Sequence, residues 1–124
     1  MHLVFAVSDV DRAYAFYREV FGWTSHIEWP GEYAELVVSG EDRLGLCRRD
    51  VYAKIAGAQP VELNGHASTA YLYVRVEDLD KTIDRLGRVG ARKLSPRQER
   101  SWDEEAAYFA DPDGNVVAVA RRLY

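Results

Sequence analysis

The hexapeptide Val7-Ser8-Asp9-Val10-Asp11-Arg12 returns later in the chain as Val76-Glu77-Asp78-Leu79-Asp80-Lys81. The first valine and both aspartates keep their places at an offset of 69, from Asp9 to Asp78. Further along, residues 44–49 are echoed by residues 117–122 at an offset of 73. Two echoes in the same order and at nearly equal offsets predict the duplication of a unit that is about half the chain long.

The first copy predicts a strand, a helix and three further strands. Residues 3–7 favour a strand, Asp9 is a good helix N-cap, and apolar side chains recur at i, i+3, i+4 and i+7 from Ala13 to Val20. Gly22 is expected to end this helix. The three strands that follow are expected at residues 23–29, 33–39 and 43–48.

The second copy predicts the same order of elements. Asp78 caps a helix whose apolar stripe is Leu79, Ile83 and Leu86, and Gly90 ends that helix. Its strands are expected at residues 70–76, 91–94, 105–110 and 116–121.

These elements predict an α+β fold made of two tandem βαβββ modules, whose mixed sheets form a cup. The modules span about residues 1–49 and about residues 68–124 within a single domain of residues 1–124. Residues 50–67 hold turn-forming Gly57, Pro60 and Asn64-Gly65, and they are expected to connect the modules.

The composition restricts the class of protein. A length of 124 residues suits one folding unit, and 48% hydrophobic with 29% charged residues is ordinary for a globular protein. No apolar run approaches the roughly 20 residues that cross a bilayer, and the first strand begins almost at Met1, so a cytoplasmic protein without a membrane partner is expected. The single cysteine, Cys47, agrees with a reducing compartment. A net charge of −4 argues against binding to nucleic acid.

Side-chain alternation along the strands separates the two faces of each sheet. Leu3, Phe5 and Val7 share one face of the first strand, and this aliphatic face is expected to pack under a helix. The opposite faces are therefore expected to line the cup. They carry His2, Val4 and Ala6, with Arg43, Gly45 and Cys47, in the first module, and Tyr71, Tyr73 and Arg75, with Val116, Ala118 and Ala120, in the second.

The sequence resembles the vicinal oxygen chelate superfamily, which includes glyoxalase I, extradiol dioxygenases, and fosfomycin and bleomycin resistance proteins. The resemblance covers essentially the whole chain. It is carried by the segment from Val7 through Phe16-Tyr17 to Val20-Phe21-Gly22-Trp23, and by the closing Tyr108-Phe109-Ala110-Asp111-Pro112-Asp113-Gly114-Asn115-Val116. The superfamily's glyoxalase/bleomycin resistance fold is the paired βαβββ arrangement expected here.

The resemblance also implies where a divalent metal would bind. Catalytic members hold it with a His, Gln or Glu near the start of each module's first strand and a Glu in each last strand. Those places correspond to His2, Gly45, Tyr71 and Ala118, of which only His2 is a ready metal ligand. One histidine does not build a coordination shell, so His2 is expected to be an ordinary polar residue at a strand end.

The other candidate metal donors are expected on the surface. His26 lies on a predicted edge strand and His66 in the connection, where isolated histidines are usually solvated. Glu35, Glu104 and Glu105 are close enough in sequence to the cup strands to supply carboxylates, but solvated surface charge is the stronger expectation.

Aromatic side chains are frequent around the predicted cup, whereas Phe5, Phe16 and Tyr17 are expected in the core. Tyr71 and Tyr73 are the strongest ligand-binding candidates, and Trp102 is expected to act as a lid or a dimer contact. Arg43 and Arg75 are expected to pair with Glu35, with a second subunit or with an acidic ligand. The candidate ligand-binding residues are Tyr71, Tyr73, Trp102, Tyr108, Tyr33, Trp29, Arg43, Arg75 and His2, and Trp23 joins the aromatic residues expected beside the cup.

The leading expectation is a homodimeric protein that binds and sequesters an aromatic or amphipathic small molecule without a metal or other cofactor, as antibiotic and natural-product resistance proteins of the superfamily do. The first alternative is a glyoxalase-like lyase or isomerase, or a dioxygenase. Such an enzyme would hold a divalent metal through His2 and unconventional donors, or it would be a metal-free catalyst that uses Tyr71 or Arg75. The second alternative is an interaction module whose cup is filled by its own side chains.

Overall fold

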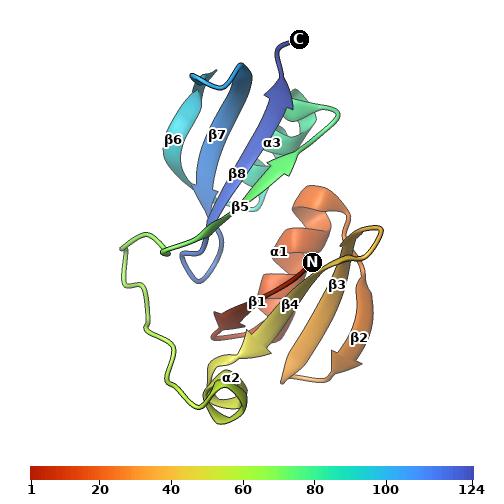
Figure 1. Ribbon diagram of the computed structural model, residues 1–124, viewed down its shortest axis with the longest axis vertical. Helices are drawn as coiled ribbons and strands as arrows, with labels where there is room; N and C mark the ends of the chain where they lie inside the picture. Colours follow the sequence, from red (N-terminus) through yellow and green to blue (C-terminus); the bar gives the residue numbers. More distant parts are fainter. The chain divides into compact units, whose positions relative to one another are not determined.

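The computed structural model describes residues 1–124 and divides the chain into two compact units, Met1–Glu62 and Leu63–Tyr124 (Figure 1). The α+β fold of two tandem βαβββ modules is confirmed. The first unit contains β1 (His2–Val7), α1 (Val10–Phe21), β2 (Ser25–Trp29), β3 (Tyr33–Ser39), β4 (Asp42–Arg48) and α2 (Arg49–Ala56). The second contains β5 (Tyr71–Arg75), α3 (Leu79–Arg88), β6 (Arg92–Glu99), β7 (Glu104–Ala110) and β8 (Val116–Arg122).

Both units build the same mixed sheet. The strand orders are β1-β4-β3-β2 and β5-β8-β7-β6. In each sheet the first and last strands of the module pair in parallel, and the remaining pairs are antiparallel. A parallel pair needs a crossover connection, which in each module includes the long helix and the two antiparallel strands.

The predicted N-caps Asp9 and Asp78 and the predicted end of α1 at Gly22 are confirmed, whereas α3 ends at Arg88 with Val89, not Gly90, as its C-cap. The Asp9 side chain accepts a hydrogen bond from the backbone N–H of Arg12, and the Asp78 side chain accepts one from the backbone N–H of Lys81. Each carboxylate thereby satisfies a donor that the first helical turn leaves without a partner. Helix α1 ends at Gly22, whose φ of 76° lies in the left-handed region that glycine adopts without strain.

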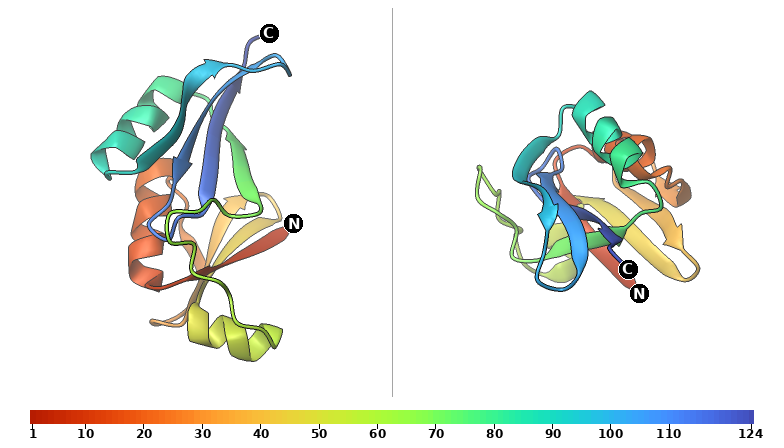
Figure 2. Two further views of the ribbon diagram at one scale, coloured as in Figure 1. Left: turned by 90° about the vertical axis from the view of Figure 1, so that its left-hand side faces the viewer. Right: turned by 90° about the horizontal axis from the view of Figure 1, so that it is seen from above.

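Each long helix covers one face of its own sheet (Figure 2). Helix α1 packs on β3 and β4, and the whole predicted stripe from Ala13 to Val20 is buried. Helix α3 packs on β8, with Leu79 and Leu86 buried and Ile83 half-buried. The opposite face of each sheet therefore stays available, as alternation along the strands predicted.

Helix α2 is an element that the sequence did not predict. Residues 49–56 fall mostly in the segment that was interpreted as a connection. The helix has no side-chain N-cap, because Arg48 precedes it, and it ends at Gly57 with a φ of 74°. It packs on β1 and β4 and buries none of its residues fully. Its position therefore depends on the sheet beside it more than on local signals.

Trp23 corrects another expectation. It was predicted on a strand beside the cup, but β2 begins only at Ser25 and the Trp23 side chain is buried. Its ring stacks on Phe21 at 4.4 Å and on Tyr17 at 6.0 Å between centroids. Trp23 therefore belongs to the core beneath α1.

Strand β6 is longer than predicted. It continues past Leu94 to Glu99 and includes Pro96, which an edge strand tolerates because one row of its backbone groups has no partner strand. No helix of the chain is both long enough and apolar enough to cross a bilayer.

Candidate functional site

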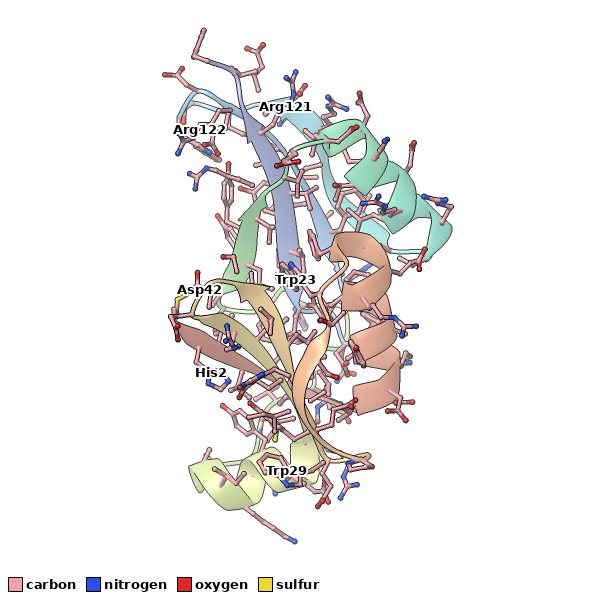
Figure 3. The ribbon with its side chains drawn as sticks, turned by 90° about the vertical axis from the view of Figure 1, so that its right-hand side faces the viewer. His2, Trp23, Trp29, Asp42, Arg121 and Arg122 are labelled. Atoms are coloured by element: carbon pink, nitrogen blue, oxygen red, sulfur yellow. The ribbon has the colours of Figure 1, made fainter.

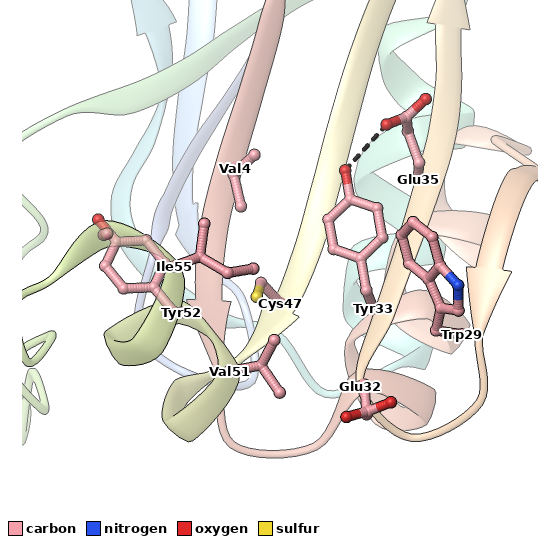
Figure 4. Close-up of a pocket in the computed structure, with 10 residues that line it drawn as sticks. Val4, Trp29, Glu32, Tyr33, Glu35, Cys47, Val51, Tyr52 and Ile55 are labelled. Atoms are coloured by element: carbon pink, nitrogen blue, oxygen red, sulfur yellow. Dashed lines mark hydrogen bonds between the residues drawn. The ribbon is translucent and has the colours of Figure 1, made fainter.

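The first unit contains a pocket of about 660 Å³ between its sheet and α2 (Figure 4). Trp29, at the end of β2 and labelled in Figure 3, forms part of the wall on the sheet side. The α2 side of the pocket is aliphatic apart from one tyrosine, and Ile55 is 78% exposed, so the pocket is open to solvent. The lining residues are Val4, Trp29, Glu32, Tyr33, Glu35, Cys47, Val51, Tyr52, Ile55 and Ala56.

The strand register explains why these side chains meet. Val4 and Glu35 are both paired with Gly45, and Tyr33 is paired with Cys47. Residues that are paired across neighbouring strands point to the same face of the sheet. This is the face that α1 leaves uncovered. By the same register it also carries His2, Arg43, Val37 and Trp29.

The phenol of Tyr33 joins two other polar groups on this face. It donates a hydrogen bond to Glu35 Oε1 at 2.9 Å, and its oxygen lies 3.0 Å from His2 Nε2. His2 Nε2 lies 3.3 Å from the same Glu35 oxygen. The Glu35 side chain is only 13% exposed, so the expectation that Glu35 is a solvated surface charge is wrong.

Gly45 gives the Tyr33 ring its space. A Cβ atom at residue 45 would lie 2.7 Å from Tyr33 Oη and 3.0 Å from Val4 Cγ2, closer than real Cβ contacts come. Gly45 is the position at which the resemblance places a metal-binding carboxylate. In this chain the Tyr33 phenol occupies the space beside that position.

The environment of Tyr33 also keeps its phenol protonated. Burial, followed by the hydrogen bond to Glu35 and the charge of Glu35, raises the pKa of Tyr33 far above its usual value of about 10. The neutral hydroxyl therefore remains a hydrogen-bond donor to Glu35 across the physiological range.

The residues present do not fit the metal site that the resemblance implies. Gly45 and Ala118 have no donor atoms in their side chains, and Tyr71 is half exposed with an aromatic neighbour. No group of three or more His, Cys, Asp and Glu side chains is placed to hold a metal ion. His2 has only Glu35 and the protonated Tyr33 beside it, which are too few donors for a usual divalent site.

The second unit places a related cluster on the open face of its own sheet. Tyr73 donates to Glu104 Oε1 at 2.6 Å, Arg75 Nε donates to Glu104 Oε2 at 2.6 Å, and Trp102 Nε1 donates to Tyr73 Oη at 2.7 Å. Glu104 is 5% exposed, so it is not the solvated charge that was expected. The hydrogen bond from Tyr73 and then the one from Arg75 hold the pKa of Glu104 below its usual value.

Two further tyrosines lie on this face. The rings of Tyr71 and Tyr108 meet edge to face with centroids 5.4 Å apart, and the Arg100 guanidinium lies 5.1 Å from the Tyr108 centroid. Burial, followed by a hydrogen bond with Tyr71, raises the pKa of Tyr108 to about 12. Tyr108 is paired with Ala118, as Tyr73 is, so its side chain points to the uncovered side of its sheet.

The predicted site residues therefore form one group in each unit. His2, Tyr33 and Trp29 lie together on the first sheet, but Arg43 is held apart by hydrogen bonds to the carbonyls of Gly40 and Asp42. Arg75 is paired as expected, although its partner is Glu104. Tyr71, Tyr73, Trp102 and Tyr108 share the second sheet.

The sequence interpretation missed the α2 wall and Glu32, and it favoured a solvated surface position for Glu35. The spacing of Val51 and Ile55, four residues apart with alanines nearby, was a signal for an amphipathic helix. Alternation along β3 was a signal for Glu35, because apolar Ala34 and Leu36 flank it and are buried on the other face of the sheet.

Comparisons with known proteins place these two units in a known group. The model of the Glyoxalase/Bleomycin resistance protein/Dioxygenase superfamily matches residues 1–119. The uncharacterized protein YraH of Bacillus subtilis (strain 168) is 33% identical over 120 residues, which cover 94% of this chain and 93% of YraH. The metallothiol transferase FosB of Lysinibacillus sphaericus (strain C3-41) is 28% identical over 120 residues, covering 92% of this chain and 75% of FosB.

Among solved structures, a glyoxalase-related enzyme from Fulvimarina pelagi superposes with a TM-score of 0.83. The match covers 98% of this chain and 86% of that one at 20% sequence identity, so it shows a shared fold.

The contact between Tyr33 and Gly45 predicts a coupling between two substitutions. Gly45→Ala should lower the free energy of unfolding more in the wild-type chain than in a Tyr33→Ala background, where two of the three closest contacts of the new methyl group are gone. We expect a coupling energy of about 1 to 2 kcal/mol from a double-mutant cycle measured by urea unfolding. Additive effects of the two substitutions would contradict the packing described here.

The raised pKa of Tyr33 predicts a dependence of stability on pH. The unfolded chain releases the phenol proton near pH 10, whereas the folded chain retains it, so the free energy of unfolding should fall as the pH rises above about 10. Tyr33→Phe, compared with the wild type by chemical denaturation over this range, should lose less stability. Parallel pH profiles of the two proteins would show that the Tyr33 phenol titrates as it does in the unfolded chain.

Proposed function

Because the chain belongs to the Glyoxalase/Bleomycin resistance protein/Dioxygenase superfamily, we propose that it binds a small molecule in the pocket between its first sheet and α2. The proposed ligand is an aromatic or amphipathic compound, and the proposed action is to hold that compound out of solution without a metal ion. Resistance to an antibiotic or another natural product is the biological role that such binding would serve.

The pocket itself is the observation that carries this proposal. Its volume of about 660 Å³ lies within the range of about 300 to 1,000 Å³ that is typical of small-molecule sites. Most of the lining is apolar, and Trp29 and Tyr33 present rings whose centroids are 5.5 Å apart. A planar ligand that stacks on such rings gains about 0.5 to 1.5 kcal/mol per pair beyond the burial of its surface.

The proposed binding does not involve a metal ion, because the side chains at the positions that correspond to metal ligands offer too few donor atoms. Two of the four positions that correspond to metal ligands are Gly45 and Ala118, and the space beside Gly45 is filled by the Tyr33 ring. The second candidate function is nevertheless a metal-dependent transferase or lyase. It is favoured by the FosB relative, which is named a metallothiol transferase, and by the carboxylate of Glu35 beside His2.

Binding can be tested with N-phenyl-1-naphthylamine, an uncharged aromatic dye whose fluorescence rises in apolar surroundings. We expect saturable binding of one dye per chain, and Trp29→Ala should weaken it about tenfold through the loss of a stacking surface. Val61→Ala removes an exposed side chain that does not line the pocket and should leave the affinity unchanged. A dye that does not saturate, or that binds equally to Trp29→Ala, would contradict a ligand site in this pocket.

Metal analysis distinguishes the two candidate functions. Protein that is purified without a chelator and without a histidine tag should contain well under one equivalent of zinc, nickel, manganese and iron in total. The reason is that His2 has too few neighbouring donors. A full equivalent of one metal that disappears in His2→Ala would overturn the metal-independent proposal and favour the enzyme.

A further inference from the structure

The charged side chains that line the pocket are all acidic. Glu32 and Glu35 are the only ionised side chains expected among the ten lining residues, and no lysine, arginine or histidine lines it. The two carboxylates lie at opposite ends of the Tyr33 ring, with Glu35 beside its hydroxyl and Glu32 beside its backbone (Figure 4). A ligand in this pocket therefore lies between two negative charges.

Both carboxylates have oxygen atoms that are available to a ligand. The hydrogen bond from Tyr33 and the contact with His2 both involve Oε1 of Glu35, so neither of them uses Oε2. The side chain of Glu32 is exposed to solvent. Because Glu35 is largely shielded from water, its attraction for a cation is screened less than that of a surface carboxylate.

The basic groups close to the pocket do not cancel this charge. The charge of Glu32 acts on Arg48, but the Arg48 guanidinium forms two hydrogen bonds with the carboxylate of Asp50 at 2.5 and 3.0 Å. His2 touches Glu35 but is not part of the lining. An anionic ligand would thus be repelled by the two lining carboxylates, and burying it would cost free energy.

The aromatic lining adds to the preference for a cation. Trp29 and Tyr33 lie at 44° to each other on the sheet, and Tyr52 lies across the pocket on α2. The face of an aromatic ring carries negative charge density and attracts ammonium groups, most strongly in tryptophan. Three such rings with two carboxylates form an environment suited to an organic cation.

We propose that the ligand of this pocket is an organic cation, with an apolar planar body and an amine or quaternary ammonium group that lies against Glu35. This inference rests on the proposed function, because it specifies the charge of the molecule that the pocket binds. The aliphatic side chains of Val4, Val51 and Ile55 contact the body of the ligand, and the aromatic rings and Glu35 contact its charged end.

The proposal is tested with three probes that share one ring system and differ in charge. These are acridine in mildly alkaline buffer, where it is neutral, the permanent cation N-methylacridinium, and the anion acridine-9-carboxylate. Isothermal titration calorimetry should show that the cation binds about tenfold more tightly than acridine and the anion more weakly than acridine, which is the size of effect expected from cation–π and partly screened ionic contacts.

Three variants locate the source of this preference. Glu35→Gln should reduce the affinity for N-methylacridinium about tenfold and change the affinity for acridine little, because only the charged probe gains from the carboxylate. Glu32→Gln should have a smaller effect in the same direction, since Glu32 is exposed. Glu19→Gln is the control: it removes the same charge from an exposed position on α1 and should leave the affinity for all three probes unchanged.

The outcomes separate this inference from the proposed function. If none of the three probes binds, the proposed small-molecule pocket is wrong. If acridine binds but N-methylacridinium binds no more tightly, the pocket stands and its preference for a cation is wrong. Equal losses of N-methylacridinium affinity in Glu35→Gln and Glu19→Gln would also overturn the inference, because they would show an effect of net charge alone.

Discussion

The packing of one long helix on one face of each four-stranded sheet determines what the other face can do. Alternation along a strand gives each sheet an aliphatic face, and α1 and α3 cover these faces in their own units. The side chains on the opposite face do not pack against these helices, so they are free to be polar or aromatic. Both units use that freedom in a similar way: each places a tyrosine that donates to a shielded glutamate, Tyr33 to Glu35 and Tyr73 to Glu104.

Small residues at two symmetric positions fit this arrangement. Gly45 in β4 leaves room for the Tyr33 ring, and Ala118 in β8 is paired with both Tyr73 and Tyr108. In the superfamily pattern these are positions of metal-binding carboxylates. Aromatic rings and hydrogen-bonded carboxylates thus line the surfaces on which catalytic relatives of the superfamily assemble a metal site. Only the first unit adds a second wall, the helix α2, and so closes its surface into a pocket.

Local signals in the sequence were enough to predict the two modules. The candidate site could not be predicted in the same way, because it depends on contacts between residues far apart in the sequence. Asp9, Asp78 and Gly22 specify helix ends through bonds to residues a few positions away, and the helix stripes follow from a fixed periodicity. The position of α2 depends on packing against β1 and β4, and its first residue has no capping side chain before it. The partner of Arg75 is 29 residues away, on a different strand, so alternation predicted its face without identifying Glu104.

The central claim is that a ligand binds between the open face of the first sheet and α2. Chemical-shift mapping of the backbone amides by ¹H–¹⁵N NMR during titration with N-methylacridinium tests it most directly. We expect the largest shifts on residues 51–56 of α2 and on β3 from Tyr33 to Glu35, with little change at α1. Shifts confined to other surfaces, or a titration that leaves α2 unaffected, would contradict it.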